Sequence, residues 1–493
     1  MEERVSASGR PAAAKVWGYS YIAFFTWNLL TTWWVYNSTP EGGVLAIVCN
    51  SLFMSWVYCL AYVTRRRLGN AWGNGAFIVY WIAFEYLHMN WKLSWPWLTL
   101  GNGFSAYPEW VQWYEFTGAL GGSLWVLAGN LLLYKAMKSF SVSRLIAPAA
   151  YILVPVIVSY GIYYGYEEKP DPVQVTVIQP NIDPYNEKFT NGTQDAQFEK
   201  LLRLARSQAS PSTDYIVFPE TSLPDALWDF QKDSLPQFAV MRAFLAAAVP
   251  RAKMVIGVSY LEMFDGASAE NLPFSASRLG DSGKFYDDYN AAVQIDTSEH
   301  IPVYKKSKLV PGPESYPLPE FTRPFQDLLF GEIGGTIGNL GSQEERTAFA
   351  APDRPGLAVG PIICYESIYG EFVTEYVQKG ATLLFIITND GWWGDTPGHR
   401  QHFQYGRLRA VETRRSIARS ANTGISGFIN QRGDIVQKAP YWEEAALTQT
   451  LNANSRITFY VRYGDYLGRV SVLLGAALLL CTALARFMKK RKA

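Results

Sequence analysis

The stretch Gly360-Pro361-Ile362-Ile363-Cys364-Tyr365-Glu366 places a thiol directly after an apolar run. The run Leu357–Ile363 is short and apolar, as buried strands are, and the segment 367–379 has apolar residues three or four apart, as helices have. The pattern predicts a strand that delivers Cys364 to the beginning of a helix. No second cysteine lies between residues 171 and 463, so this thiol is either inert core or a working nucleophile.

The same alternation of short apolar runs and helical stretches extends on both sides of Cys364. Further strands are predicted at Val173–Ile178, Tyr215–Phe218, Met254–Tyr260, Ala291–Ile295, Leu383–Ile387 and Ile425–Ile429. Further helices are predicted at 195–209, 235–249 and 398–416. Such alternation indicates an α/β domain.

The composition divides the chain of 493 residues into unlike parts. Residues 17–167 and 467–487 are apolar and aromatic, whereas 171–463 has an ordinary soluble composition. The formal net charge of +1 and the lack of a basic patch give no reason to expect a nucleic-acid partner. We therefore predict a membrane domain over 1–170, a soluble domain over 171–463, and a final membrane helix with a basic tail over 464–493.

A membrane span needs about 20 mostly apolar residues. Six spans are predicted, five of them before the soluble domain: 17–36, 43–63, 71–88, 118–136, 146–166 and 467–487. Their basic connections hold Arg4, Arg10 and Lys15, then Arg65–Arg67, then Lys135, Lys138 and Arg144, and finally the tail from Lys489. All of these clusters fall on one side, which the positive-inside rule makes the cytoplasm. The soluble domain is thus expected outside it. Cys49, Cys59 and Cys481 fall within spans and are read as small apolar residues.

Two other contexts could supply what a nucleophilic thiol needs. Glu220 ends an apolar strand in Phe218-Pro219-Glu220, and Lys306 stands among the three lysines of Tyr304–Lys308. Taken singly, a strand-end carboxylate or a lysine run is more often a solvated surface. Together they can act on Cys364. A carboxylate takes the thiol proton, while a helix N-terminus and a lysine stabilise the thiolate. The lysine and the N–H of Tyr365 can stabilise an oxyanion.

The order of the motifs resembles the nitrilase, or carbon–nitrogen hydrolase, superfamily. The motifs are FPE at 218–220, YKKSKLVPGPE at 304–314, ICYE at 363–366, TNDGWWGD at 388–395 and RSANTGISGFIN at 419–430. With helices before and after the soluble domain, the chain resembles the membrane branch of that superfamily, the apolipoprotein N-acyltransferases. The implied fold is a membrane helical bundle joined to a nitrilase-like α-β-β-α sandwich.

The resemblance also implies roles for particular residues, and no metal or cofactor. Glu220 becomes the general base, Lys306 the oxyanion-stabilising lysine and Cys364 the nucleophile. Four more residues match the family's active-site arm and substrate contacts: Glu314, Tyr365, Glu366 and Phe189, the last in the place of a tryptophan.

The implied reaction moves a fatty acyl chain from a phospholipid, commonly phosphatidylethanolamine, through a cysteine thioester. The acceptor is the N-terminal amine of the diacylglyceryl-cysteine of a lipoprotein, and the expected location is the bacterial inner membrane with the catalytic domain on the periplasmic side. The alternatives are a membrane-tethered amidase, with water as acceptor, and a transporter or scaffold carrying an inactive nitrilase module. The family commonly has seven helices before the catalytic domain, where five are predicted here.

Four further segments leave two readings open. The aromatic residues of the connection 89–117 are either an interfacial belt, which we favour, or part of a lipid entry. His399 and His402 could share a metal or act separately. The arginines from 407 to 419 are read as a solvated helix face rather than a headgroup site. The Gly- and Pro-rich loop 311–345, with apolar residues at 321, 325 and 328–330, is either an apolar lid or core packing.

Overall fold

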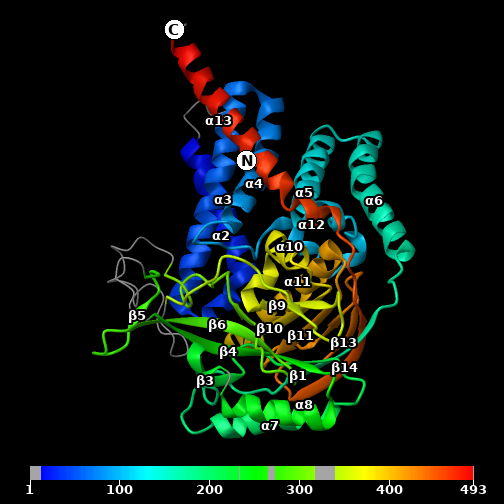
Figure 1. The fold of residues 1–493 in the computed structure, drawn as a ribbon. Helices are drawn as coiled ribbons and strands as arrows, with labels where there is room; N and C mark the ends of the chain where they lie inside the picture. Colours follow the sequence, from blue (N-terminus) through cyan, green and yellow to red (C-terminus); the bar gives the residue numbers. More distant parts are fainter. Residues whose placement is uncertain (1–12, 233, 265–271, 317–338, 492–493) are drawn as a thin grey trace.

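The structure is a computed structural model that describes residues 13–232, 234–264, 272–316 and 339–491. A sandwich of two β-sheets lies at one end of the molecule, and long helices extend from the other (Figure 1). The N-terminal helices and the C-terminal helix lie together although they are far apart in the sequence. Helices contributed by both ends of the chain therefore lie on the same side of the sandwich.

The first sheet has eight strands in the order β14-β1-β2-β4-β6-β5, with β3 on β4 and β7 on β6. Its strands are β1 (Pro172–Gln179), β2 (Tyr215–Val217), β3 (Leu223–Trp228), β4 (Lys253–Phe264), β5 (Ser277–Arg278), β6 (Phe285–Ile295), β7 (Val303–Lys305) and β14 (Ala445–Asn452). β1, β2 and β4 run parallel, and β6 pairs antiparallel with β4.

The second sheet has six strands in the order β13-β12-β11-β10-β9-β8. They are β8 (Phe349–Ala350), β9 (Ala358–Ile363), β10 (Leu383–Thr388), β11 (Ile417–Ala421), β12 (Gly427–Ile429) and β13 (Ile435–Lys438). The central strands β9, β10 and β11 are parallel, and every residue of β10 and β11 is buried. Parallel strands covered on both faces read as continuous apolar runs, as β9 and β10 do.

Helices cover the outer face of each sheet, which gives the four layers of an α-β-β-α sandwich (Figure 1). The first sheet carries α7 (Gln194–Gln208) and α8 (Pro236–Ala248), and the second carries α10 (Gly370–Gln378) and α11 (Pro397–Thr413). One core cluster joins the facing sides of the two sheets, and another joins the first sheet to α7 and α8. The predicted α/β sandwich is confirmed.

The predicted strands coincide with β1, β2, β4, β6, β9, β10 and β12, and the helices predicted at 195–209, 235–249 and 398–416 coincide with α7, α8 and α11. The strands that the sequence did not indicate are either short or edge strands, except β11. β11 has the sequence Ile-Ala-Arg-Ser-Ala, and it was not predicted because two of its five residues are polar although all five are buried. The helix predicted at 367–379 is wrong at its beginning, because residues Cys364–Ile368 form a separate 3₁₀ turn before α10.

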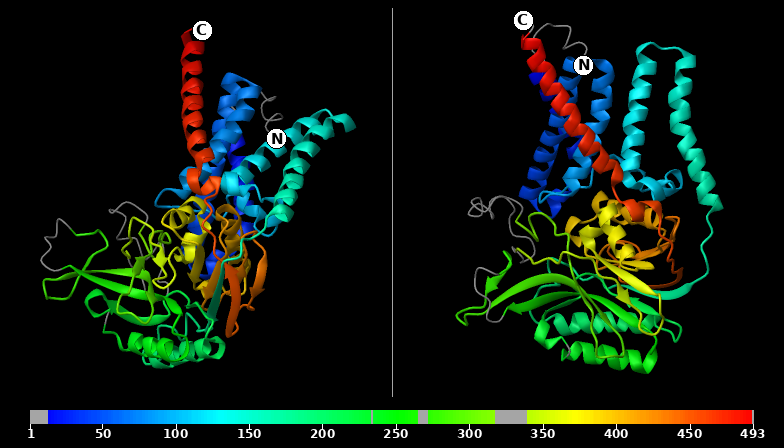
Figure 2. Two further views of the ribbon diagram at one scale, coloured as in Figure 1. Left: turned by 45° about the vertical axis from the view of Figure 1, so that its right-hand side comes forward. Right: turned by 45° about the horizontal axis from the view of Figure 1, so that its top comes forward.

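All six predicted spans are helices in the structure. They are α2 (Ala13–Thr32), α3 (Pro40–Leu68), α4 (Asn70–Met89), α5 (Tyr114–Lys138), α6 (Val142–Gly165) and α13 (Tyr466–Arg491). Among the described residues, four helices are long and apolar enough to cross a membrane: α3, α5, α6 and α13 over Tyr466–Ala485. Figure 2 shows α5 and α6 as a hairpin beside the bundle of α2, α3 and α4, and α5 contacts α4.

Buried polar contacts and close packing join α5 to the catalytic sandwich. The Glu115 carboxylate lies 2.9 Å from Nε of Arg414, and both side chains are almost fully buried. Gly118 breaks the helical geometry of α5 with a φ of 60°, and a Cβ atom there would lie 2.3 Å from the ring of Tyr460. Only glycine tolerates both constraints at once.

The long loop predicted at 311–345 is described only at its two ends. Residues 317–338, with the apolar residues proposed as a lid, lie outside the described residues. At its beginning, Pro311 and Pro313 line a cavity beside α3, and at its end Gly341 packs on β6 through an N–H donated to the carbonyl of Asp288.

Candidate active site

The three predicted catalytic residues follow three different strands and meet in one place. Glu220 comes three residues after β2, Lys306 directly after β7, and Cys364 directly after β9. Two of them therefore stand on the first sheet and the thiol stands on the second. All three line one cavity, so the fold brings together residues that are up to 144 positions apart (364 − 220).

Lys306 is held between two carboxylates. Its Nζ lies 2.7 Å from Oε1 of Glu314 and 3.4 Å from Oε1 of Glu220, and its side chain is fully buried. Burial opposes the charge, but Glu314 and Glu220 outweigh it and hold the pKa of Lys306 above its usual range. This lysine is therefore a fixed positive charge beside the thiol.

Asn290, which was not predicted from the sequence, holds the Glu220 and Glu314 carboxylates in position. Its Nδ2 donates to Oε1 of Glu220 at 2.7 Å and to Oε1 of Glu314 at 3.2 Å. Glu314 also accepts from the N–H of Val310 at 2.7 Å, and this ties it to the loop after Lys306. Glu314 thus lies in the site, where the resemblance to the family's active-site arm had placed it.

Lys188 is a second cation that the sequence did not point to, although its neighbour Phe189 was predicted. Its Nζ donates to the carbonyl of Glu220 at 3.0 Å, and it is almost fully buried. Burial lowers the pKa of Lys188 to about 8, against the charges of Glu220 and Cys364. Phe189 is half exposed at the rim of the cavity and stacks on Trp392, with ring centroids 6.4 Å apart.

The backbone is strained on both sides of the reaction centre. Cys364 has a φ of 50° and Thr221, next to Glu220, a φ of 45°. Side-chain-bearing residues rarely adopt this region, and such strain tends to collect at functional sites. Gly257 on β4 lets that strand pass close to Glu220, because a Cβ there would lie 2.6 Å from the Glu220 Cα.

The expectation that a helix N-terminus stabilises a thiolate at Cys364 is wrong. The thiol begins a five-residue 3₁₀ turn rather than the first turn of α10. Burial and the Glu220 carboxylate raise the pKa of Cys364, and the Lys306 ammonium only partly opposes them. The resting group is therefore the thiol, and a nucleophilic role would require its proton to leave as the sulfur attacks.

Glu366 does not line either cavity, contrary to the prediction that it contacts substrate. It is fully buried, and its carboxylate accepts five hydrogen bonds. The donors are the N–H groups of Ile363, Ser307 and Lys308 and the hydroxyls of Tyr304 and Tyr376. It clamps the segment after Lys306 to the segment before Cys364, because each of its two oxygens binds one of these segments.

His402 supports the backbone at Cys364. Its Nε2 lies 3.1 Å from the Cys364 carbonyl and its Nδ1 lies 2.9 Å from Asp390. His399 instead stacks on Tyr441, so the two histidines do separate tasks. Among the described residues, no group of three or more His, Cys, Asp or Glu could hold a metal ion.

The arginine-rich stretch is not the solvated face that the sequence suggested. Arg409, Arg414, Arg415 and Arg419 are all at most 1 % exposed. Arg419 donates to Asp390 at 2.6 Å, and Arg409 pairs with Glu412 at 2.7 Å. Buried guanidinium groups with partners in the fold hold the structure together and are not available to headgroups.

Two cavities meet at Cys364. One has a volume of about 410 Å³, and its lining includes the charged and polar residues Glu220, Asn290 and Lys306 among apolar ones. The other has a volume of about 240 Å³, is almost wholly apolar, and runs beside α3. Besides Cys364, both are lined by Ser38, Val310, Pro313 and Trp393. The thiol is thus reached from a polar side and from an apolar side.

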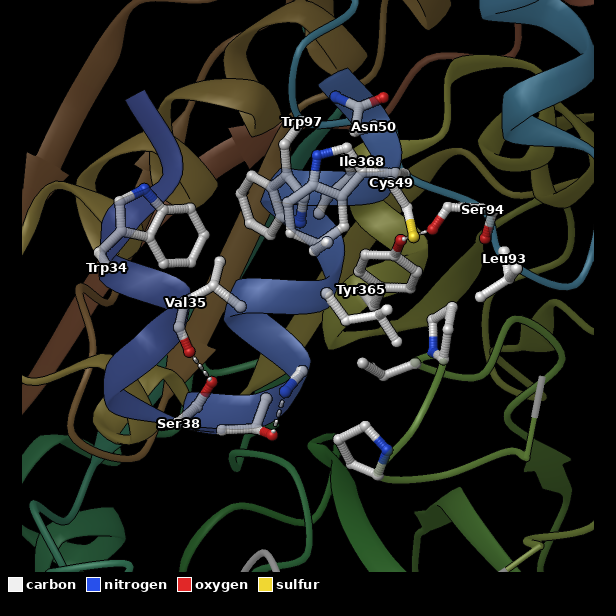
Figure 3. Close-up of a pocket in the computed structure, with 18 of the residues that line it drawn as sticks. Trp34, Val35, Ser38, Cys49, Asn50, Leu93, Ser94, Trp97, Tyr365 and Ile368 are labelled. Carbon is white, nitrogen blue, oxygen red and sulfur yellow. Dashed lines mark hydrogen bonds between the residues drawn. The ribbon is translucent and has the colours of Figure 1, made fainter. Parts of the chain in front are cut away.

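The aromatic connection 89–117 forms a wall of the apolar cavity (Figure 3). Trp97 is buried against Trp34 and Trp393, and its carbonyl accepts from the hydroxyl of Tyr405. Tyr365 reaches the same wall by donating to the Ser94 carbonyl at 2.8 Å. The favoured interfacial-belt reading is therefore wrong for Trp97, which is packed inside the protein.

Comparisons with known proteins identify the family of the chain. The family model described as carbon-nitrogen hydrolase matches residues 174–458, more than half of the chain. A solved structure of a CN-hydrolase superfamily protein from Xanthomonas campestris aligns with 58 % of this chain and 92 % of its own, at 15 % identity and a TM-score of 0.37. On the strength of the family model, the chain belongs to the carbon–nitrogen hydrolase superfamily.

The N-terminal part of the chain shows which branch of the superfamily the chain belongs to. The model described as apolipoprotein N-acyltransferase N-terminal domain matches residues 5–132. An apolipoprotein N-acyltransferase from Allorhizobium ampelinum is 31 % identical over 410 residues, which cover 79 % of this chain and 70 % of the relative. One from Chlorobaculum tepidum is 29 % identical over 481 residues, which cover 95 % and 87 %. The chain is a member of the apolipoprotein N-acyltransferase family, as its motifs predicted.

Proposed function

We propose that this enzyme N-acylates lipoproteins through a thioester on Cys364, with Glu220 as general base and Lys306 as the stabiliser of the oxyanion. The observation that carries the proposal is the meeting of two unlike cavities at one thiol. An acyl chain requires an apolar cavity, and burying it there contributes about 25 cal/mol per Å² of apolar surface removed from water. The proton transfers require the polar one.

In the first half-reaction, the Cys364 sulfur attacks the ester carbonyl of a phospholipid. The thiol proton moves to Glu220, and Lys306 stabilises the oxyanion. The carbon–oxygen ester bond then breaks, Glu220 returns the proton to the departing alcohol, and a lysophospholipid leaves. The acyl chain remains on Cys364 as a thioester in the apolar cavity.

In the second half-reaction, the free α-amine of a diacylglyceryl-cysteine attacks the thioester. Glu220 takes a proton from the amine and delivers it to the departing Cys364 sulfur, so the enzyme is restored. The product is an amide at the N-terminus of the lipoprotein. Asn290 keeps the Glu220 carboxylate in place for both transfers through its 2.7 Å hydrogen bond.

We also propose the acyl donor and the cellular location that the family resemblance implies. The donor is phosphatidylethanolamine, and the enzyme lies in the bacterial inner membrane with residues 171–463 on the periplasmic side. The distribution of basic clusters among the six predicted spans supports this orientation. Tyr365 is proposed as an acyl-chain contact and Phe189 as a rim contact, because each lines one of the cavities.

The test follows both half-reactions by mass spectrometry of the purified protein. Phospholipid alone should add one acyl mass to Cys364, and a diacylated lipopeptide should then remove it as an amide. Cys364→Ala should abolish both events, and Glu220→Gln should slow both by at least about 100-fold. The matched control, Cys59→Ala with Cys481→Ala, lies outside both cavities and should retain activity. Turnover by Cys364→Ala would end the thioester proposal. Release of free fatty acid in place of the amide would indicate an amidase.

A further inference from the structure

The apolar cavity beside α3 contains polar atoms that the proposed reaction does not use. Its length follows a single stripe of α3, from Gly42 to Phe53 at intervals of three and four residues. Eleven residues of helix span about 16 Å. Ser38, just before α3, lines both cavities together with Cys364, so the beginning of α3 lies at the Cys364 end of the apolar cavity. Phe53, further along α3, and His88, whose ring contacts Phe53, therefore lie at the opposite end.

At this opposite end, His88 presents a free hydrogen-bond donor. Its Nδ1 accepts from Nε1 of Trp91 at 2.9 Å, so the proton of the neutral ring is on Nε2. His88 is 7 % exposed, and its Nε2 has no hydrogen-bond partner among the described residues. The ring is held by Phe53, Phe84 and Trp91, with centroid distances of 5.8, 5.0 and 5.5 Å, so the donor is fixed in direction.

Trp95 presents a second donor to the same cavity. Its backbone N–H donates to the carbonyl of His88 at 3.3 Å, and this holds the two residues together. Its Nε1 is buried and, within the described part of the chain, has no partner. Leaving a buried donor unpaired costs about 1–3 kcal/mol. Two such donors in one apolar cavity therefore indicate a ligand atom that accepts hydrogen bonds.

A third unpaired atom in the cavity is the Oδ1 of Asn50, which is an acceptor. The orientation of the Asn50 amide follows from Asn28. The Nδ2 of Asn28 donates to the Phe24 carbonyl at 2.8 Å, so the Oδ1 of Asn28 must accept from the Nδ2 of Asn50 at 2.6 Å. Figure 3 shows Asn50 and Ser38 at opposite ends of the cavity. An acceptor cannot bind the oxygen of a ligand carbonyl directly, so the site for such an oxygen is defined by His88 and Trp95 alone.

We propose that His88 and Trp95 bind an ester carbonyl of a glycerolipid. An ester carbonyl is a strong acceptor flanked by hydrocarbon, which matches two N–H donors within apolar walls. Because His88 lies beside Phe53, at the end away from Cys364, the ester held there is not the one that the thiol attacks. It is either the second acyl ester of the donor phospholipid or a glyceryl ester of the acceptor lipopeptide.

This inference rests on the proposed function, and ether lipids test it. In the wild-type enzyme, replacing the relevant ester by an alkyl ether, which lacks the carbonyl, should lower kcat/KM about tenfold. One arm uses a phospholipid with an ether only at the second chain. The other arm uses a lipopeptide with both glyceryl chains ether-linked. The arm that shows the loss identifies which lipid supplies the ester.

Two variants remove one donor each while keeping an aromatic ring: His88→Phe and Trp95→Phe. In each variant, kcat/KM for the ester substrate should fall about tenfold relative to wild type. Replacing the ester by the ether should then lower kcat/KM by a clearly smaller factor than in wild type. The control is Trp72→Phe, on the same helix as His88 but 61 % exposed. It should retain the full ether penalty, that is, the fall of about tenfold in kcat/KM when the ether replaces the ester. Melting temperatures within a few degrees of wild type should show that the variants fold. The wild-type ether comparison needs no variant at all.

The inference is overturned if wild-type enzyme acylates Cys364 normally and shows no ether penalty in either arm. It is overturned as well if His88→Phe keeps the full penalty. A wild-type enzyme that never forms the thioester would instead overturn the proposed function, and mass spectrometry of the protein separates this case from the other two.

Discussion

Replacing Glu366 tests whether this carboxylate is structural or contacts substrate. Its Oε1 accepts from the Tyr304 hydroxyl and the N–H groups of Ser307 and Lys308 at 2.7, 2.7 and 3.2 Å. Its Oε2 accepts from the Ile363 N–H at 2.8 Å and from the Tyr376 hydroxyl at 2.9 Å.

In Glu366→Gln, the amide oxygen can replace only one of these two oxygens. The three donors at Oε1 favour placing it there, so the NH₂ group faces the N–H of Ile363. One backbone donor is then unpaired, and the charge-assisted bonds become neutral. A buried unpaired donor costs about 1–3 kcal/mol, and each lost charge-assisted bond adds to this, so we expect destabilisation of about 2–4 kcal/mol.

The measurement is the unfolding temperature of the purified protein in detergent, together with the rate of Cys364 acylation. Both should fall in Glu366→Gln, because the clamp holds the segments of Lys306 and Cys364. The control is Glu375→Gln on α10, whose half-exposed carboxylate pairs with Arg346 and should contribute less than about 1 kcal/mol. An unchanged unfolding temperature with lost turnover would refute a structural role and restore Glu366 to the substrate site.

Three further predictions concern orientation and pH. Cysteines introduced at Ser38 and at Arg66, near opposite ends of α3, should react with an impermeant thiol reagent from opposite sides of the membrane, and labelling from one side would contradict the proposed topology. The pKa of Lys188 is lowered to about 8, so the ammonium is lost above that pH. The acylation rate should fall there, and Lys188→Arg should move the fall to higher pH; an unmoved fall would exclude Lys188. Burial raises the pKa of Asp465 to about 7 from an unfolded value of about 3.9. The stability from its protonated form is fully present below about pH 4 and lost as pH rises through 7. Asp465→Asn should therefore raise the unfolding temperature at pH 8 more than at pH 5, and an equal effect at both would contradict this.

The sequence predicted which residues meet at the candidate site, because Glu220 and Cys364 follow apolar strands that it indicated. β2 and β9 lie in the two facing sheets of the sandwich, and the residues that follow them line one cavity between the sheet ends. Glu220, Lys306, Cys364 and Glu314 were found in this way or through the motif order. Lys188 and Asn290 were not, because each acts by a hydrogen bond to Glu220 that only the folded chain creates.

Two of the errors share a physical cause, which is the burial of charge. Arg419 and its neighbouring arginines look like a solvated face in a helical projection, yet each finds a carboxylate or carbonyl inside the fold. Glu366 was predicted to contact substrate because it follows the nucleophile. Its position next to Cys364 is explained equally well by a clamp, and only the five donors around it distinguish the two.

The ion pair between Glu115 and Arg414 has a consequence for how the enzyme can be divided. α5 also supplies the N–H of Ala119 to the Glu412 carboxylate at 3.1 Å, and the side chain of Gln112, just before α5, receives a 2.7 Å hydrogen bond from Arg414. A fragment that begins at residue 171 would retain Arg414 and Glu412 but lose these partners. We therefore expect the sandwich to be less stable as a separate fragment than in the whole chain. The carboxylate that neutralises Arg414 comes from a helix that precedes the sandwich in the chain, so the fold of the sandwich and that of the N-terminal helices depend on each other.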